Sequence, residues 1–207
     1  FICFRKIFTN FMKFKNKIDD YINISSNTIL SLKDHAKSIE KISKLINKAY
    51  KQKRTLYVCG NGGSDSEAEH FVTELVCTFE NRKRKPISAI SLNSNSSSIS
   101  AWSNDFDYKT FLKRAVEAHL KKNDTLLILT TSGGSKKVSQ SRNIISAAEV
   151  AKKIGAKIIS LTGKSGGEII KLSDLSIHVK NNQTSHIQEA HLAILHLICV
   201  FFEKKYL

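Results

Sequence analysis

The sequence predicts an α/β protein with a doubly wound, five-stranded parallel sheet, and three observations support this. Five short apolar segments lie between residues 56 and 179, and each is followed by a helical pattern, as is typical of parallel strands with crossover helices. The segments LLILT and KIISL are apolar on both faces, as expected when helices cover both sides of a sheet. Pro86 is the only proline, so no Pro-rich linker divides the chain.

The N-terminal region precedes the first strand and is expected to be helical. Between residues 18 and 49, isoleucine and leucine recur at spacings of three, four and seven, which predicts amphipathic helices. Residues 1–17 are aromatic and basic, and charged side chains interrupt the apolar core that a signal peptide requires. We therefore interpret residues 1–17 as an N-terminal extension and residues 18–207 as a single domain.

The strands are expected at residues 56–58, 87–92, 125–130, 157–161 and 175–179. In a doubly wound sheet, ligands bind beyond the carboxyl ends of the strands, where loops lead into helices. The loops after the first and third strands are therefore the candidate binding sites.

The first of these loops is CGNGGS, residues 59–64. Its glycines let backbone N–H groups approach an anion, and the helix that follows adds a favourable dipole. A tight turn that needs positive φ angles explains the glycines equally well, so this loop alone leaves both interpretations open.

The second loop is TTSGGS, residues 130–135, and a helical pattern begins near Lys136. One hydroxyl is enough to cap a helix, whereas four hydroxyls in six positions can donate to the oxygens of a phosphate monoester. The order of a nucleotide-binding P-loop is absent, and no acidic ribose ligand follows a dinucleotide-binding glycine motif. We therefore expect this loop to bind a phosphosugar rather than ATP or NAD.

Two helical segments carry a candidate acid–base and metal set. His70 and Glu74 are four residues apart and share one helix face, and the C-terminal helical pattern carries Gln188 and His196. These residue types suit Zn²⁺ or a similar divalent ion, although an i, i+4 His/Glu pair is often a plain surface pairing. Gln188 and His196 lie about 12 Å apart along a helix axis. Sharing one metal would therefore require steeply converging side chains or two subunits, and otherwise His196 could act as a proton donor.

The charge of the chain favours an anionic ligand over nucleic acid. The formal net charge is +15 at pH 7, but most of it is Lys and is dispersed along the sequence. The run from Arg82 to Lys85 is the only dense patch, and we interpret it as a solvated loop rather than a polyanion site. The positive field should raise the encounter rate with a sugar phosphate.

Other features predict a cytoplasmic oligomer. The four cysteines contain no C-x-x-C pair, which indicates a reducing compartment. The longest apolar stretches are far shorter than the roughly 20 residues needed to span a bilayer. The C-terminal run LAILHLICVFF offers more apolar surface than one helix face should bury, so we expect self-association, most simply as a tetramer.

Five ordered blocks together resemble the bacterial phosphoheptose isomerases of the SIS (sugar isomerase) class. The blocks are CGNGGSDSEAEHFVTEL, WSNDF, TTSGGS, SLTGKSGGEI and IQEAHLAILH, and they span roughly residues 56–203. The resemblance implies the flavodoxin-like SIS fold, a homotetramer with active sites at subunit contacts, and metal-assisted aldose–ketose isomerisation.

The resemblance also implies roles for individual residues. Glu74 and His196 would exchange protons with the substrate. The implied zinc ligands are His70, Glu74, Gln188 and His196. The implied substrate contacts are Asn61, Gly62, Gly63, Glu74, Asn104, Asp105 and Gln188, with Thr130, Thr131, Ser132 and Ser135 at the phosphate. The expected reaction converts sedoheptulose 7-phosphate to D-glycero-D-manno-heptose 7-phosphate through an enediol, for lipopolysaccharide or capsule.

The chain departs from the pattern of these isomerases at three positions. His186 and Thr78 stand where Arg is usual, and Gly134 stands where Asn is usual. These changes affect no proposed acid–base residue, but they bear on which sugar is bound. A non-catalytic SIS module that regulates or binds proteins, and an isomerase of another sugar phosphate, are the alternatives.

Overall fold

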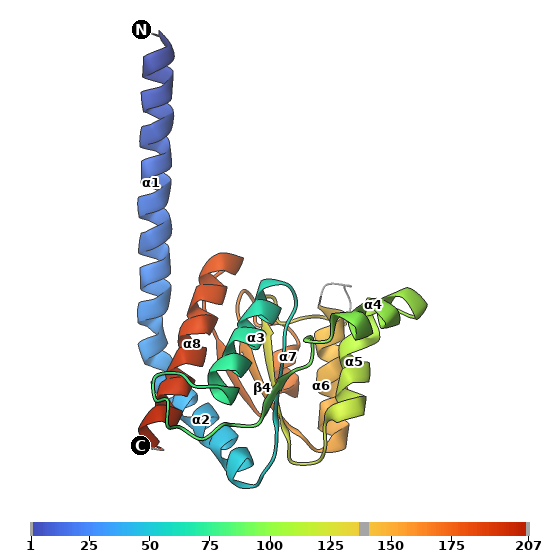
Figure 1. Cartoon of the computed structure of the whole chain (residues 1–207). Coiled ribbons are helices and arrows are strands. Elements are labelled where there is room, and N and C mark those ends of the chain that lie inside the picture. Colours follow the sequence, from blue (N-terminus) through green and yellow to red (C-terminus); the bar gives the residue numbers. More distant parts are fainter. Residues whose placement is uncertain (1, 137–140, 206–207) are drawn as a thin grey trace.

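A five-stranded parallel sheet lies between two helical layers in the computed structural model, which describes residues 2–136 and 141–205 (Figure 1). The strands are β1 Leu56–Cys59, β2 Ala89–Ser91, β3 Thr125–Thr130, β4 Lys157–Thr162 and β5 Leu175–His178. All neighbours pair in parallel, in the order β2-β1-β3-β4-β5. The predicted doubly wound sheet is confirmed, and its order reverses between β1 and β3, where such folds bind ligands.

The helices divide into two layers, one on each face of the sheet. They are α1 Ile2–Leu30, the 3-10 helix η1 Ser31–His35, α2 Ala36–Lys51, α3 Gly63–Val76, α4 Ser96–Asp105, α5 Tyr108–His119, α6 Arg142–Ile154, α7 Ile169–Leu172 and α8 Thr184–Lys205. One buried cluster joins α2, α3 and α8 to the sheet, and a second joins α5, α6 and α7 to the opposite face. Figure 1 shows the two layers to the left and right of the strands.

The central strand β3 shows why the sequence has no polar alternation there. Its six residues are all buried, because successive side chains point to opposite faces and both faces are covered. Leu127 and Leu129 enter the core under α3 and α8, whereas Leu126 and Ile128 enter the core under α5 and α6. Each buried leucine or isoleucine contributes roughly 1.5–3 kcal/mol, so this strand anchors both layers.

Helix α1 is continuous from Ile2 to Leu30 and projects away from the sheet (Figure 1). It therefore crosses the expected limit between residues 17 and 18 without a break. Only its C-terminal part packs on the domain, where η1 and α2 follow. The predicted amphipathic pattern is confirmed in α2, because Ile39, Ile42 and Ile46 are buried in the core.

Helix α8 is a core helix of the domain. Within the described residues, one segment, Thr184–Glu203, has the length and apolar composition of a membrane span, and half of it is buried inside the protein. Ile187, Ile194, Ile198 and Phe202 are fully buried in the core shared with α2 and α3. Its apolar composition is therefore explained by packing inside the fold.

Candidate active site

The first loop turns β1 into α3 over the carboxyl edge of the sheet. Gly62 has a φ of 56°, which favours glycine, and the backbone N–H groups of Asp65 and Ser66 bond back to its carbonyl. Gly63 lies against the Gln188 side-chain amide, so a side chain at this position would have to displace that amide. Gln188, an expected substrate contact, therefore lies beside the first loop.

Asn61, at the tip of this loop, is held by two residues that the sequence analysis did not identify. Its side-chain amide pairs with that of Asn143, with N···O distances of 3.0 and 2.7 Å. The Tyr108 hydroxyl donates to the side-chain oxygen Oδ1 of Asn61 at 2.8 Å. Burial, followed by the charge of Asp65, raises the pKa of Tyr108, so the phenol stays protonated. Asn61 is therefore fixed by helices from the other layer.

The second loop packs tightly against the loop that follows β4. Gly133 has a φ of 75°, and a Cβ there would overlap the Gly166 carbonyl, so only glycine allows this approach. Two hydroxyls stabilise the turn itself: Thr130 Oγ1 accepts from the Gly133 N–H at 3.2 Å, and Ser132 Oγ accepts from the Gly134 N–H at 3.4 Å. Thr130 is buried, whereas Thr131, Ser132 and Ser135 are partly exposed and can reach a ligand.

The helix after this loop begins later than the sequence predicts. The expected start near Lys136 is wrong: α6 begins at Arg142, after Ser141 in the left-handed conformation, and residues 137–140 lie outside the described part. The Lys136 N–H and the Ser135 hydroxyl both donate to Glu168 Oε1 at 2.9 Å instead. These bonds, with the nearby Lys136 charge, lower the pKa of Glu168. In the TTSGGS loop, which we call the hydroxyl loop, the Glu168 carboxylate therefore already accepts from groups that could bind an anion.

The residues expected to act in acid–base chemistry come together between α3 and α8. His70 Nε2 lies 2.9 Å from His196 Nε2 and 3.6 Å from Glu74 Oε1. The Phe79 ring, which the sequence analysis did not single out, stacks on His196 with centroids 5.6 Å apart. Burial and the neighbouring His70 lower the pKa of His196, while Glu74 opposes the shift. The imidazole is therefore largely uncharged at neutral pH.

Among three of the four expected metal ligands, two donor-atom separations suit a metal site: His70 to His196 and His70 to Glu74. In a tetrahedral zinc site with bonds of about 2.0–2.1 Å, neighbouring ligand atoms are roughly 3.3 Å apart, close to the distances joining His70, Glu74 and His196. In the described residues no three such groups are already arranged around one point, because the two imidazoles are hydrogen-bonded to each other.

Gln188, the fourth expected ligand, does not join this group within the chain. Its amide contacts Gly63, and His70 lies seven residues further along α3, roughly 10 Å away along the axis. His196 is likewise eight residues beyond Gln188 on α8. The wide separation of Gln188 and His196 along one helix, expected from the sequence, is therefore present in the fold.

Glu67 is a buried carboxylic acid that the sequence analysis missed. It lies on α3 between Gly63 and His70, and burial raises its pKa to about 8 against a hydrogen bond from Ser64. A spacing of three before His70 puts both residues on neighbouring faces of the helix, but in the sequence Glu67 is indistinguishable from the exposed Glu69.

Helix α8 carries two further polar residues whose roles are structural. His191 is buried, its Nε2 lies 3.2 Å from the Thr162 carbonyl, and burial lowers its pKa to about 4. Glu189 accepts hydrogen bonds from Tyr21 and Ser25 of α1 and from His186, which overcome desolvation and lower its pKa. His186, at a position where Arg is usual, thus binds its neighbour on the same helix.

Asn104 and Asp105 lie far from this cluster in the single chain. Both are exposed at the end of α4, where the Asn104 amide donates to Asp105 Oδ1 at 2.9 Å. Figure 1 shows α4 across the sheet from α8. These two expected substrate contacts are therefore not brought to His196 by the fold of one chain.

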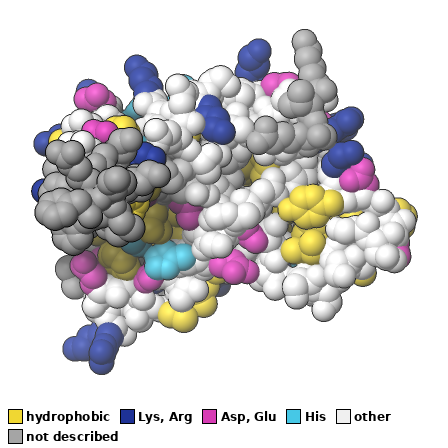
Figure 2. Space-filling model, turned by 90° about the horizontal axis from the view of Figure 1, so that it is seen from above, with side chains coloured by type: hydrophobic (Ala, Val, Ile, Leu, Met, Phe, Trp, Pro, Cys, Tyr) yellow, Lys and Arg dark blue, Asp and Glu magenta, His cyan; other side chains and the backbone are white. Residues whose placement is uncertain are grey.

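The prediction that the basic run 82–85 is a solvated loop is wrong for one residue. Arg82, Lys83 and Lys85 are exposed, but Arg84 is buried and pairs with Glu203 of α8 at 2.7 Å. Elsewhere the charge is dispersed as expected, and Figure 2 shows Lys and Arg side chains scattered around the edge of one face. The same view shows histidine and acidic side chains close together beside an apolar area.

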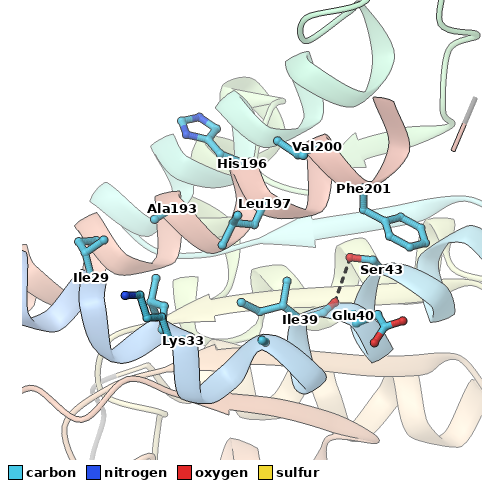
Figure 3. A pocket seen from close by; sticks show the side chains of 12 residues that line it. Ile29, Lys33, Ile39, Glu40, Ser43, Ala193, His196, Leu197, Val200 and Phe201 are labelled. Atoms are coloured by element: carbon cyan, nitrogen blue, oxygen red, sulfur yellow. Dashed lines mark hydrogen bonds between the residues drawn. The ribbon is translucent and has the colours of Figure 1, made fainter. Parts of the chain in front are cut away.

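An apolar groove of about 650 Å³ opens beside the cluster, between α8 and the segment from α1 to α2 (Figure 3). Ile29, Ile39, Leu197 and Phe201 line it, and His196 lies at its edge. Leu197 remains 46% exposed. The C-terminal apolar run thus leaves hydrophobic surface open next to a proposed catalytic residue.

Comparison with known proteins shows what the chain is similar to. The sequence profile of the SIS domain matches residues 20–163. A phosphoheptose isomerase of Helicobacter pylori is 42% identical over 151 residues, covering 73% of this chain and 75% of that protein. One of Leptospira biflexa is 36% identical over 192 residues, with coverage of 92% and 94%. The structure of a phosphoheptose isomerase from Francisella tularensis has a TM-score of 0.84 at 30% identity, covering 91% of this chain and 97% of that one.

Proposed function

This chain belongs to the SIS domain family and, within it, to the phosphoheptose isomerases, and from this premise we propose that it converts sedoheptulose 7-phosphate to D-glycero-D-manno-heptose 7-phosphate. The observation that carries the proposal is the meeting of Glu74 and His196 around His70. A carboxylate and an imidazole that both contact one histidine can act as base and acid on adjacent carbon and oxygen atoms.

The proposed mechanism moves one proton between C1 and C2. Glu74 removes a proton from C1 while His196 supplies a proton to the oxygen on C2, and the enediol forms. Glu74 then returns its proton to C2 while His196 takes the proton from the C1 oxygen, which gives the aldose and restores both groups. The lowered pKa of His196 makes its imidazolium form the better acid, so this form donates in the first step and the neutral imidazole that remains accepts in the second.

The hydroxyl loop would hold the phosphate away from the reacting carbons. Thr131, Ser132 and Ser135 are accessible at the carboxyl edge of the sheet, and Thr130 shapes the turn beneath them. Phosphate contacts at this distance orient C1 and C2 without taking part in proton transfer. Asn61 and the backbone of Gly62 and Gly63, at the adjacent loop, would contact the sugar hydroxyls.

We propose zinc as the metal, held by His70, Glu74 and His196, with Gln188 as a further ligand when the helices or subunits bring it closer. When bound, a divalent ion polarises the substrate carbonyl and stabilises negative charge on its oxygen. The protein groups themselves bind the sugar, orient its chain and transfer the protons.

A second copy of the chain would complete the site. Glu74 lies eleven residues beyond Gly63, roughly 16 Å along α3. The six carbon–carbon bonds of the sugar, each about 1.5 Å long, span less than about 9 Å even when extended. The exposed position of Asn104 and Asp105 and the open groove beside His196 also support a homotetramer with shared sites. We place this enzyme in the cytoplasm, supplying heptose for lipopolysaccharide or capsule.

The direct test is conversion of sedoheptulose 7-phosphate compared with fructose 6-phosphate by the purified protein. Turnover of the heptose phosphate with solvent deuterium incorporated at C1 or C2 is expected. Turnover of the hexose phosphate alone would assign the chain to another sugar phosphate. Binding without turnover or exchange of either would instead support a non-catalytic SIS module.

A further inference from the structure

We infer that Arg84, together with Glu203, is a positioning residue for the catalytic pair, which holds Glu74 of α3 in register with His196 of α8. The inference rests on the proposed function of Glu74 and His196. It concerns the one basic residue of the run 82–85 that is removed from solvent.

The guanidinium of Arg84 forms hydrogen bonds with the end of the helix that carries Glu74. Its Nη2 donates to the Glu74 carbonyl at 2.5 Å, and its Nη1 donates to the Leu75 carbonyl at 3.0 Å. These are among the last carbonyls of α3, which ends at Val76 and has no intrahelical partners for them. A positively charged donor at a helix C-terminus also interacts favourably with the helix dipole. Arg84 therefore fixes the backbone of the proposed base itself.

The Nε–H group of Arg84 connects this helix end to α8. Arg84 Nε donates to Glu203 Oε1 at 2.7 Å, and the other carboxylate oxygen accepts from the Asn81 N–H at 2.7 Å. Glu203 lies seven residues after His196, so the two share one face of α8. The chain of contacts thus runs from the Glu74 backbone through Arg84 and Glu203 to the helix that carries His196.

The directions of these hydrogen bonds favour arginine over lysine at position 84. A planar guanidinium can bond two helix carbonyls and a carboxylate at once, which the single ammonium of lysine cannot do in the same directions. Arg84 Nη1 also donates to the Lys85 carbonyl at 2.8 Å, so its position is determined on every side.

The decisive variant replaces both charges by apolar side chains of similar size, Arg84→Met with Glu203→Leu. Replacing a whole buried ion pair in this way commonly preserves stability, whereas removing one partner leaves an uncompensated charge. We expect a folded protein whose kcat falls by about 10²-fold with little change in KM, because catalysis is sensitive to displacements of about 1 Å. Arg82→Met, in the exposed part of the same run, is the matched control and should keep wild-type kinetics.

A second readout is independent of turnover. The Nε2 atoms of His70 and His196 are 2.9 Å apart, so their imidazole ¹⁵N NMR signals report whether α3 and α8 keep their register. These signals should move in the double variant and stay unchanged in Arg82→Met. If the double variant does not fold, Arg84→Lys, which keeps the charge, should lower kcat by about tenfold and move the same signals.

A folded double variant, or a folded Arg84→Lys protein, with wild-type kcat and unchanged imidazole signals would overturn the positioning role. Wild-type protein without activity on any sugar phosphate would refute the proposed function instead. In that case the imidazole signals would still decide whether Arg84 sets the register of the two helices.

Discussion

His70 Nε2 and His196 Nε2 are 2.9 Å apart, although the two residues are separated by 126 positions in the chain. The contact joins α3, which follows the first loop, to α8, which closes the domain. Glu74 lies 3.6 Å from the same His70 atom. The proposed base Glu74 and the proposed acid His196 thus come from opposite halves of the sequence, and both contact His70.

Glu74→Gln should lower kcat by about 10²–10⁴-fold and leave substrate binding nearly intact, because Gln keeps the shape but loses the basicity of Glu. His196→Asn should show a comparable loss, and the double variant should be barely worse than either single variant if the two act as a unit. Turnover and solvent deuterium exchange measure this, with exposed Glu69→Gln on the same helix as control. Wild-type exchange in Glu74→Gln would rule out this mechanism.

Ser132→Ala combined with Ser135→Ala should raise KM by more than it lowers kcat. Phosphate contacts are made in both the ground state and the transition state, so their loss weakens binding in both. Steady-state kinetics with the heptose phosphate measure the two constants. An unchanged KM in this double variant would remove the phosphate assignment from the loop.

Glu168→Gln should strengthen anion binding. The Ser135 hydroxyl and the Lys136 N–H donate to the Glu168 carboxylate, and a substrate phosphate would have to displace that negative charge. Neutral Gln accepts more weakly, since hydrogen bonds to ionised groups are roughly twice as strong. Calorimetry with inorganic phosphate should give a lower Kd, and kinetics a lower KM. A weaker Kd would indicate that Glu168 organises the loop instead of competing for it.

Glu67→Gln should make stability less dependent on pH. Burial raises the folded-state pKa of Glu67 to about 8, above the ordinary 4.5. Between these values the folded protein binds more protons than the unfolded chain, so the contribution of Glu67 to stability is greatest below pH 4.5 and is lost as the pH rises towards 8. Gln does not ionise, so we expect the variant to gain stability relative to wild type as the pH rises from 5 to 8.

Urea unfolding of both proteins at several pH values between 5 and 8 tests this effect. Glu69→Gln, an exposed change on the same helix, should follow the wild-type curve. Parallel pH profiles for wild type and Glu67→Gln would show that Glu67 ionises normally in the folded protein.

The protein should behave as a tetramer in light scattering, with a mass near four times the chain mass of 23.2 kDa. Leu197, which is 46% exposed in the groove beside His196, is the residue to change. Leu197→Glu should reduce the mass and the activity together, because a charge cannot be buried in an apolar interface without a partner. A monomeric wild-type protein at micromolar concentration would contradict shared active sites.

The sequence by itself determined the sheet, the order of its elements and the two loops at its carboxyl edge. Strand and helix differ in the period of their apolar residues, and that period is local information. For this reason β3 matches its predicted bounds, and Gly62, Gly133 and Gly134 of the two loops have positive φ. The blocks around His70, Glu74 and His196 identified the family for the same reason, since a motif is a local pattern.

Only the tertiary structure decided which side chains lose water and which meet. Arg84 and Arg82 are alike in the sequence, yet Arg84 is buried because α8 brings Glu203 to it. Glu67 resembles Glu69 in the sequence, and folding buries only Glu67, while Ser135 meets Glu168 only where two loops are packed together. Burial and long-range contact depend on the path of the whole chain, because they arise when distant helices close over the same face of the sheet.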